Sequence, residues 1–283
     1  MTWTPVGDVL PSMLGDARLE LHWATQLVSA PGATWLPSEA DHSHTNLGWD
    51  DALGVLVGRS VGDEHLRAAL VLGSLELVVL EGERERATLG LAGRDMGSAL
   101  TWLGEHMRRD AAEAPELPVH DMPDHPVSHG APFSDGDPSG RAELEAWFSN
   151  ASAAIYRAVA DEPTASIVRC WPHHFDVASL VVLDVDADAE DARSIGVGFS
   201  PGDDSYSQPY FYVNPWPYPP ADELPPLDEA ARWHTEGWTG AVLTGEQVVD
   251  AGPSHQAALV DRERRDGRAP QGHAARVHVP SRG

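Results

Sequence analysis

The chain has 283 residues, of which 44 are acidic and 19 basic, and its formal net charge is −25. Such a charge disfavours nucleic acid and anionic lipid as partners. The single cysteine, Cys170, excludes an intrachain disulfide, and the absence of lysine excludes Schiff-base and P-loop chemistry. No apolar run reaches the roughly 20 residues of a membrane span, and no leader pattern is present, so we expect a cytoplasmic protein.

The first half of the chain predicts a helix, a loop, several strands and a second helix. Leu19, Trp23 and Leu27 recur at helical spacing, which predicts a helix over 16–30 that ends at Pro31-Gly32. A polar loop with histidines follows. Alternating and apolar runs then predict strands within 52–59, 66–72, 74–82 and 86–92, and helical spacing returns over 95–108.

The second half repeats this order after a long connector. Residues 111–138 are acidic and rich in proline, which opposes regular structure. Asp137-Pro138 is a good start for a second long helix. Strands are then predicted within 166–171, 175–185, 193–200, 208–216 and 238–245.

We therefore predict an α+β protein with two similar lobes of antiparallel strands and flanking helices, an arrangement that an ancient duplication would produce. The predicted organisation is an N-terminal lobe, a connector, a C-terminal lobe and a disordered tail, over residues 1–110, 111–138, 139–262 and 263–283.

Five short motifs carry a resemblance to known sequences. They are LHWATQLV (21–28), LVLGSLELVVLEG (70–82), PHHFD (172–176), GFSPG (198–202) and PYFYVNPWP (209–217). Together they resemble a family of uncharacterised bacterial proteins, a domain of unknown function. The resemblance implies a bacterial, cytoplasmic α+β protein, and it brings no activity that could be transferred to this chain.

The stretch RCWPHHFD, residues 169–176, is the strongest candidate for chemistry. On an extended strand His174 and Asp176 would share one face. The pair suits metal ligation, or an imidazole oriented by a carboxylate. A structural role is the more common fate of a single histidine, and a cysteine within an apolar strand such as Cys170 is usually an inert thiol.

Two further histidine groups lie near strands. His42 and His44 form an HxH pair that suits a divalent metal such as Zn, Fe or Mn. His234 and Glu236 alternate between two tryptophans, and Glu236 is a candidate general base. We expect His42, His44, His174 and His234 as metal ligands or proton carriers, with solvated or structural roles as the alternative for each.

An aromatic surface is the other candidate site. The run PYFYVNPWPYPP and its neighbours suggest a groove for a small apolar or sugar-like ligand, to which Asp203 and Asp204 would add carboxylates. The predicted groove residues are Trp171, Tyr210, Tyr212, Trp216 and Trp238. Two functions stay open: a metal-dependent or His/carboxylate acid–base enzyme using His174, Asp176 and Glu236, and a non-catalytic binding protein that uses the aromatic groove.

Overall fold

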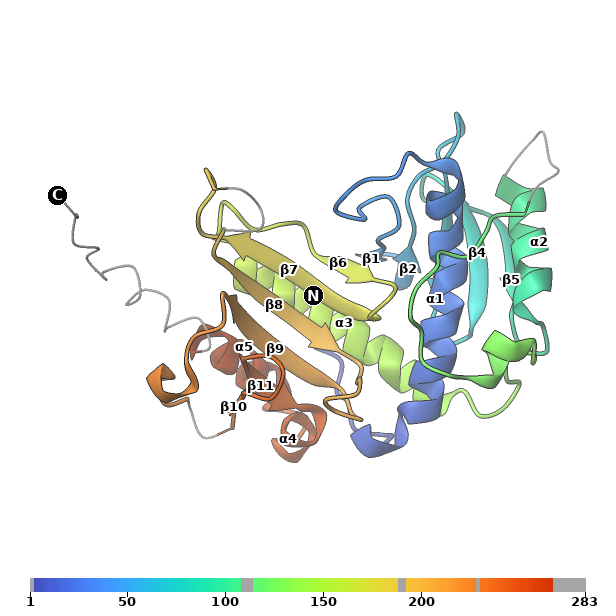
Figure 1. Ribbon diagram of the computed structural model, residues 1–283. Helices are drawn as coiled ribbons and strands as arrows, with labels where there is room; N and C mark the ends of the chain where they lie inside the picture. The colour runs from blue at the N-terminus through green and yellow to red at the C-terminus, as the bar shows by residue number, and fades with distance from the viewer. Residues whose placement is uncertain (1–2, 108–113, 188–191, 228–229, 267–283) are drawn as a thin grey trace.

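The computed structural model describes residues 3–107, 114–187, 192–227 and 230–266. These residues form five α-helices and two antiparallel sheets of five and six strands (Figure 1). The α+β prediction with two sheet-bearing lobes is therefore confirmed. Within the described ranges, no helix combines the length and the apolarity that crossing a bilayer demands.

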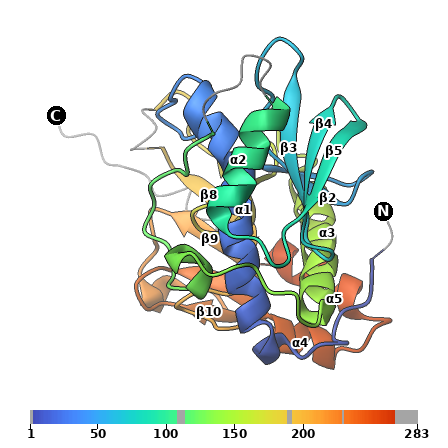
Figure 2. The same cartoon turned by 90° about the vertical axis from the view of Figure 1, so that its right-hand side faces the viewer.

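The first lobe is a five-stranded meander with two helices against one face. Helices α1 and α2 lie side by side over β3, the central strand (Figure 2). The strand order follows the sequence, β1-β2-β3-β4-β5. The elements are α1 (Gly15–Trp35), β1 (Gly48–Asp50), β2 (Val55–Val57), β3 (Leu66–Val71), β4 (Glu76–Glu81), β5 (Arg84–Gly90) and α2 (Met96–Met107).

Helix α1 continues past the predicted stop at Pro31-Gly32 and ends at Trp35, so that boundary was wrong. Pro31 is buried inside the helix, where packing offsets the hydrogen bond that its missing N–H cannot make. A side chain at Gly32 would collide with the backbone carbonyl of His44. The glycine is therefore a packing site for the histidine loop rather than a helix terminator.

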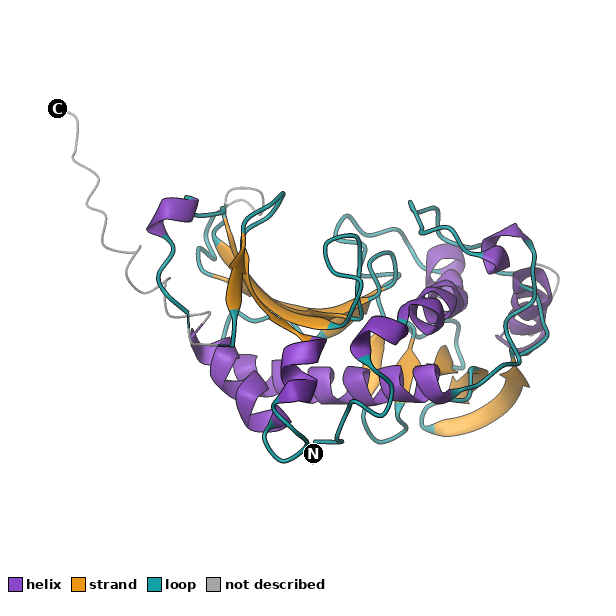
Figure 3. Ribbon diagram, turned by 90° about the horizontal axis from the view of Figure 1, so that it is seen from below, coloured by secondary structure: helices purple, strands orange, loops and turns teal. Residues whose placement is uncertain are grey.

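The second lobe has a curved six-stranded sheet of order β10-β11-β9-β8-β7-β6. Helices α3 and α5 lie against its convex face, and its concave face opens away from them (Figure 3). The elements are α3 (Ser139–Val159), β6 (Arg169–Trp171), β7 (Asp176–Val182), β8 (Ser194–Ser200), β9 (Tyr210–Trp216), β10 (Arg232–His234), β11 (Gly240–Thr244), α4 (Gly245–Asp250) and α5 (Gln256–Asp266).

Short elements were the ones that sequence patterns missed. Strands β1 and β10 have three residues each, too few for a two-residue period to be visible. Helix α5 extends to Asp266, which is inside the segment predicted as a disordered tail. The remainder of that segment, 267–283, lies outside the described residues.

The two sheets are joined at their edges. Leu47 and Cys170 exchange two backbone hydrogen bonds of 2.9 Å, which link the segments beside β1 and within β6. This contact covers two edge strands that would otherwise expose unpaired backbone groups. In both lobes a long helix precedes an antiparallel sheet, which is the likeness that the sequence suggested, although in the second sheet only β6 to β9 follow the chain order. Its origin by duplication stays a prediction.

The connector between the lobes is packed against them along part of its length. Phe133 is fully buried, and the backbone carbonyl of Pro123 accepts a 3.0 Å hydrogen bond from the indole of Trp23 on α1. A 3₁₀ turn, η2, spans Pro126–His129. The connector therefore follows α1 and brings His120 to the histidines of the second lobe.

A buried ion pair holds the two long helices together. Arg141 on α3 donates a 3.0 Å hydrogen bond to Oε2 of Glu20 on α1, and both side chains are less than 10% exposed. Oε1 of Glu20 accepts from the backbone N–H of Ser134 at 2.6 Å. The pair ties α1, α3 and the connector at one point.

Replacing Arg141 with Met tests this pair. Glu20 would remain buried without its cation, so we expect the free energy of unfolding to fall by about 3–5 kcal/mol. The matched control is Arg157→Met, which removes a partly exposed cation 3.1 Å from Asp261 and should cost about 1 kcal/mol or less. Guanidinium denaturation measures both losses, and equal losses would contradict the role assigned to the buried pair.

Candidate functional site

A pocket of about 190 Å³ opens on the concave face of the six-stranded sheet. Alternation along β9 directs Phe211 and Val213 into the core beside α3 and leaves Tyr210, Tyr212 and Asn214 on the open face. The residues that line the pocket are His174, Asp176, Ser200, Asp203, Tyr210, Tyr212, Asn214 and Trp238. We refer to it as the open-face pocket.

Two glycines in β8 make room for the side chains of β9 that line the pocket. Gly198 pairs with Tyr212, and Gly196 pairs with Asn214, on the neighbouring strand. A Cβ at Gly198 would overlap the Tyr212 ring and its hydroxyl, and one at Gly196 would overlap the Asn214 amide oxygen. The β9 side chains therefore lie across bare backbone of β8, and Tyr212 reaches Asp176 on β7.

Asp176 is a carboxyl of the pocket wall with one paired and one unpaired oxygen. Its Oδ2 accepts a 2.6 Å hydrogen bond from the Tyr212 hydroxyl. Its Oδ1 is shielded from solvent and has no hydrogen-bond partner among the described residues. Burial raises the pKa of Asp176, although the Tyr212 hydrogen bond and the neighbouring His174 act in the opposite direction. A buried oxygen without a partner is a position where a ligand can bind.

A second tyrosine–carboxylate pair stands beside the first. Tyr210 donates a 2.5 Å hydrogen bond to Oδ2 of Asp203, and Oδ1 of Asp203 accepts from the backbone N–H groups of Ser205 and Tyr206. Burial and the Asp203 charge raise the pKa of Tyr210 far above its usual range. The phenol therefore keeps its proton and the carboxylate is held in one orientation.

Trp238 closes the pocket and rests on His234. Their rings stack with centroids 4.3 Å apart. The carbonyl of Glu236 can only accept, so Nε2 of His234 donates to it at 2.7 Å, and Nδ1 accepts from the Tyr206 hydroxyl at 3.0 Å. Both ring nitrogens are thus engaged. His234 supports Trp238 and is not part of the pocket lining.

The stretch RCWPHHFD forms the hairpin turn between β6 and β7. The chain reverses over 172–175, so the extended geometry predicted for this segment is absent. Phe175 takes a left-handed φ of 58° and is fully buried. This turn sends His174 toward the open-face pocket, while the His173 ring lies 5.1 Å from that of His120 on the connector.

The first lobe fixes the position of this hairpin. His22 and Gln26, one turn apart on α1, both donate hydrogen bonds to the carbonyl of Pro172, at 2.9 Å and 2.7 Å. The His22 ring also stacks on Phe175 at 5.4 Å. Helix α1 therefore orients the turn that carries His174.

The histidines predicted as metal ligands do not converge. His42 has a left-handed φ of 56°, so the HxH segment is a turn rather than an extended pair, and its two rings lie 6.2 Å apart. Nδ1 of His44 accepts from the backbone N–H of Glu39. Across the described residues, no group of three or more His, Cys, Asp or Glu side chains could hold a metal ion. The predicted set of His42, His44, His174 and His234 is thus not assembled.

Other predicted site residues lie outside the pocket lining. Glu236 is exposed and contributes its carbonyl to His234. Trp171 packs edge-on to His173, and Trp216 is 48% exposed beside Tyr218. Cys170 is fully buried, and burial raises the pKa of its thiol well above the usual value, so it is no nucleophile.

Sequence reasoning missed Asn214, Ser200 and the two glycines. The signal was present as alternation: G-x-G in β8 aligns with Y-x-N in β9. Reading it requires knowing which strands are neighbours. We also expected Asp176 to orient His174. In the structure the Asp176 carboxylate instead accepts a hydrogen bond from the Tyr212 hydroxyl.

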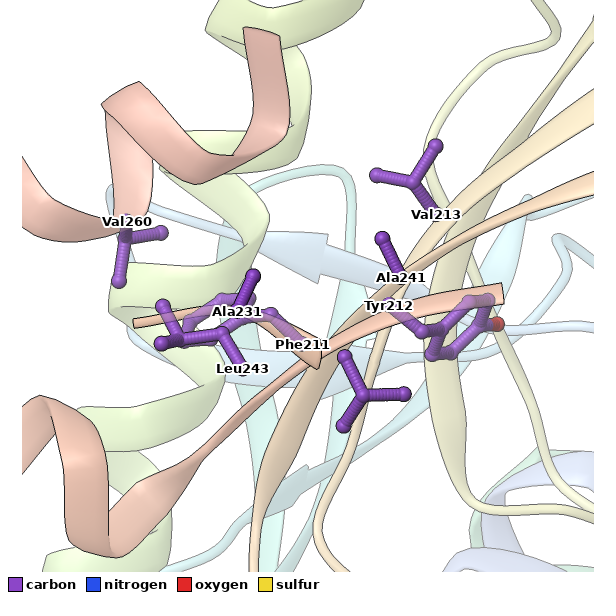
Figure 4. A pocket seen from close by; sticks show the side chains of 8 residues that line it. Phe211, Tyr212, Val213, Ala231, Ala241, Leu243 and Val260 are labelled. Carbon is purple, nitrogen blue, oxygen red and sulfur yellow. The ribbon is translucent and has the colours of Figure 1, made fainter. Parts of the chain in front are cut away.

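A second, much smaller cavity of about 10 Å³ shares Tyr212 with the lining of the open-face pocket. Phe211, Leu243 and Val260 gather on one side of it, and the ring of Tyr212 points away from them (Figure 4). Its lining is apolar and its size is that of a packing defect. Its lining includes Phe211 and Val213, the residues of β9 that point into the core.

No known protein family model matches this chain, and no curated protein or solved structure matches it. The resemblance to an uncharacterised bacterial family stays a prediction.

Replacing Gly198 with Ala tests whether glycine makes this room. The added methyl group would displace the Tyr212 ring and break its bond to Asp176, so we expect a loss of about 1–3 kcal/mol in unfolding free energy. The control is Gly90→Ala on strand β5, where nothing lies within 4 Å of the added carbon. Urea denaturation compares them. The double variant Gly198→Ala/Tyr212→Ala should recover part of the loss, and a neutral Gly198→Ala would refute this packing account.

The buried His22 predicts a pH dependence of stability. Burial lowers the pKa of its imidazole to about 4, whereas in the unfolded chain it is about 6.5. As the pH falls, the unfolded state takes up this proton first. The stabilisation that His22 gives to the folded state is therefore complete above about pH 6.5 and is lost as the pH falls to about 4.

The variant His22→Gln keeps an amide donor for Pro172 and removes the titration. We expect its denaturation midpoint to fall less steeply than that of wild type over this interval. His129→Gln, on the exposed connector, is the matched loss of one imidazole. If the slope of His22→Gln equals that of wild type, His22 does not govern acid stability.

Proposed function

We propose that this protein is a His/carboxylate acid–base enzyme that acts on a small molecule in the open-face pocket. The observation that carries the proposal is the meeting of His174 and Asp176, from the hairpin and β7, with three aromatic side chains in one recess. Convergence of titratable groups on a concave aromatic site is typical of small-molecule enzymes. The geometry of the described residues favours chemistry without a metal ligand set. We expect the protein to act in the cytoplasm.

Asp176 is assigned the main proton-transfer role. Burial raises the pKa of this carboxyl, in the direction of neutral pH. A group whose pKa lies nearer the working pH can both release and accept a proton. Oδ2 is occupied by Tyr212, and Oδ1 is available to the ligand. His174 supplies the second titratable group, and Trp238 with Tyr210 supplies the surface on which the substrate rests.

A non-catalytic binding protein is the second candidate. The hydrogen bonds from Tyr212 to Asp176 and from Tyr210 to Asp203 make a rigid aromatic wall, which is the feature that a binding site needs. In this reading His174 contacts the ligand without exchanging a proton. The two candidates share the pocket and differ in turnover.

A thermal-shift screen separates these candidates. Small amines, polyols, carboxylic acids and phosphate esters are tested for stabilisation of wild type and of Asp176→Asn. We expect at least one class to stabilise wild type and to lose its effect in Asp176→Asn. Asp63→Asn, an exposed residue in the first lobe, is the matched change of charge.

Compounds that bind are then followed by proton NMR for turnover. For an enzyme, we expect His174→Gln to reduce the rate by about 100-fold or more while binding persists. His129→Gln should retain full activity. Binding without turnover would favour the binding protein, and the absence of any Asp176-dependent ligand would contradict both candidates.

A further inference from the structure

Two residues that line the open-face pocket each have a buried, unpaired acceptor oxygen. Oδ1 of Asp176 and Oδ1 of Asn214 are both shielded from solvent and lack a hydrogen-bond partner among the described residues. Unpaired buried acceptors are costly, so the complementary ligand carries N–H or O–H donors.

The charge of the pocket is negative. Asp176 and Asp203 lie in its wall, and the described residues that line it include no arginine. Arg18 approaches from behind, donating a 2.7 Å hydrogen bond to the carbonyl of Gly202, and its charge acts on Asp203 and Asp204. Among the described residues no arginine acts on Asp176 in this way, and its neighbour of opposite sign is His174. His174 is the single lining group that can become positive.

The aromatic wall adds a surface that attracts cations. The ring of Trp238 lies 6.4 Å from that of Tyr210 and 6.3 Å from that of Tyr212, and the two tyrosine rings are 6.0 Å apart. At these separations the three rings pack on one another and form one wall. A cation that lies against this wall would be attracted by the ring quadrupoles of Trp and Tyr. Carboxylate and aromatic groups thus favour the same kind of ligand.

We propose that the ligand of the open-face pocket carries a protonated primary amine, which binds Oδ1 of Asp176 and Oδ1 of Asn214 and lies against Trp238. This inference rests on the proposed use of the pocket and adds the chemical class of its substrate. A neutral polyol would satisfy the acceptors but bring no positive charge to Asp176. An anionic ligand would meet Asp176 and Asp203 unfavourably.

Isothermal titration calorimetry with 1,4-diaminobutane and its neutral analogue 1,4-butanediol tests the charge preference. The titrations use 0.15 M salt, because attraction between exposed charges more than about 8 Å apart is then largely screened. We expect the diamine to bind at least tenfold more tightly than the diol. Asp176→Asn should weaken diamine binding at least tenfold, and Trp238→Leu should weaken it several-fold. Circular dichroism establishes that each variant is folded.

Asp63→Asn controls for the large net charge of the protein, because it removes one carboxylate from the first lobe. It should leave diamine affinity unchanged. If Asp63→Asn and Asp176→Asn weaken binding equally, the diamine binds the acidic surface and the inference fails. If the diol binds as tightly as the diamine and both depend on Asp176, the preference for an amine is refuted, while the open-face pocket remains supported as a binding site. If the diamine does not bind at all, the amine is again refuted, and the broad ligand screen alone decides the proposed function.

Discussion

The absence of two side chains on β8 is the constraint on which the site depends. Gly196 and Gly198 leave bare backbone opposite Asn214 and Tyr212, and any larger residue would overlap them. Without this space Tyr212 could not cross β8 to reach Asp176, and the recess would be filled by the sheet's own side chains. Because glycine weakens a strand interior, the two glycines lower the stability of β8.

The opposite face of the same strands restores that stability. Phe199 and Phe211 pack on Trp147 of α3 with ring centroids about 5–6 Å apart. Because side chains alternate along a strand, each strand residue that lines the pocket is flanked by one that builds the core. The site is therefore carried on a rigid support, although Asp203 and Trp238 come from the loops beside it.

The first lobe also contributes to the geometry of a site in the second. His22 and Gln26 on α1 hold the Pro172 carbonyl, and the Glu20–Arg141 pair fixes α1 against α3. The hairpin that bears His174 is thus held from outside its own sheet. Coupling of this kind explains why a two-lobed chain would keep both lobes for one pocket on one sheet.

The sequence by itself determined the α+β class, the long helices and most strands, and it made the RCWPHHFD stretch a candidate site. Helical and strand periods are local properties of the chain, so they can be recognised without a fold. His174, Asp176, Tyr210, Tyr212 and Trp238 were candidates because of their chemistry, and the structure places all five in one lining.

Only the tertiary structure decided which candidates meet. His42, His44 and His234 were as plausible in sequence as His174, yet none of the three is among the residues that line the pocket. Asn214 and the glycines of β8 gain their meaning from the pairing of β8 with β9. Strand pairing and helix docking bring together residues far apart in the chain, and the local pattern of a sequence carries no record of those distances.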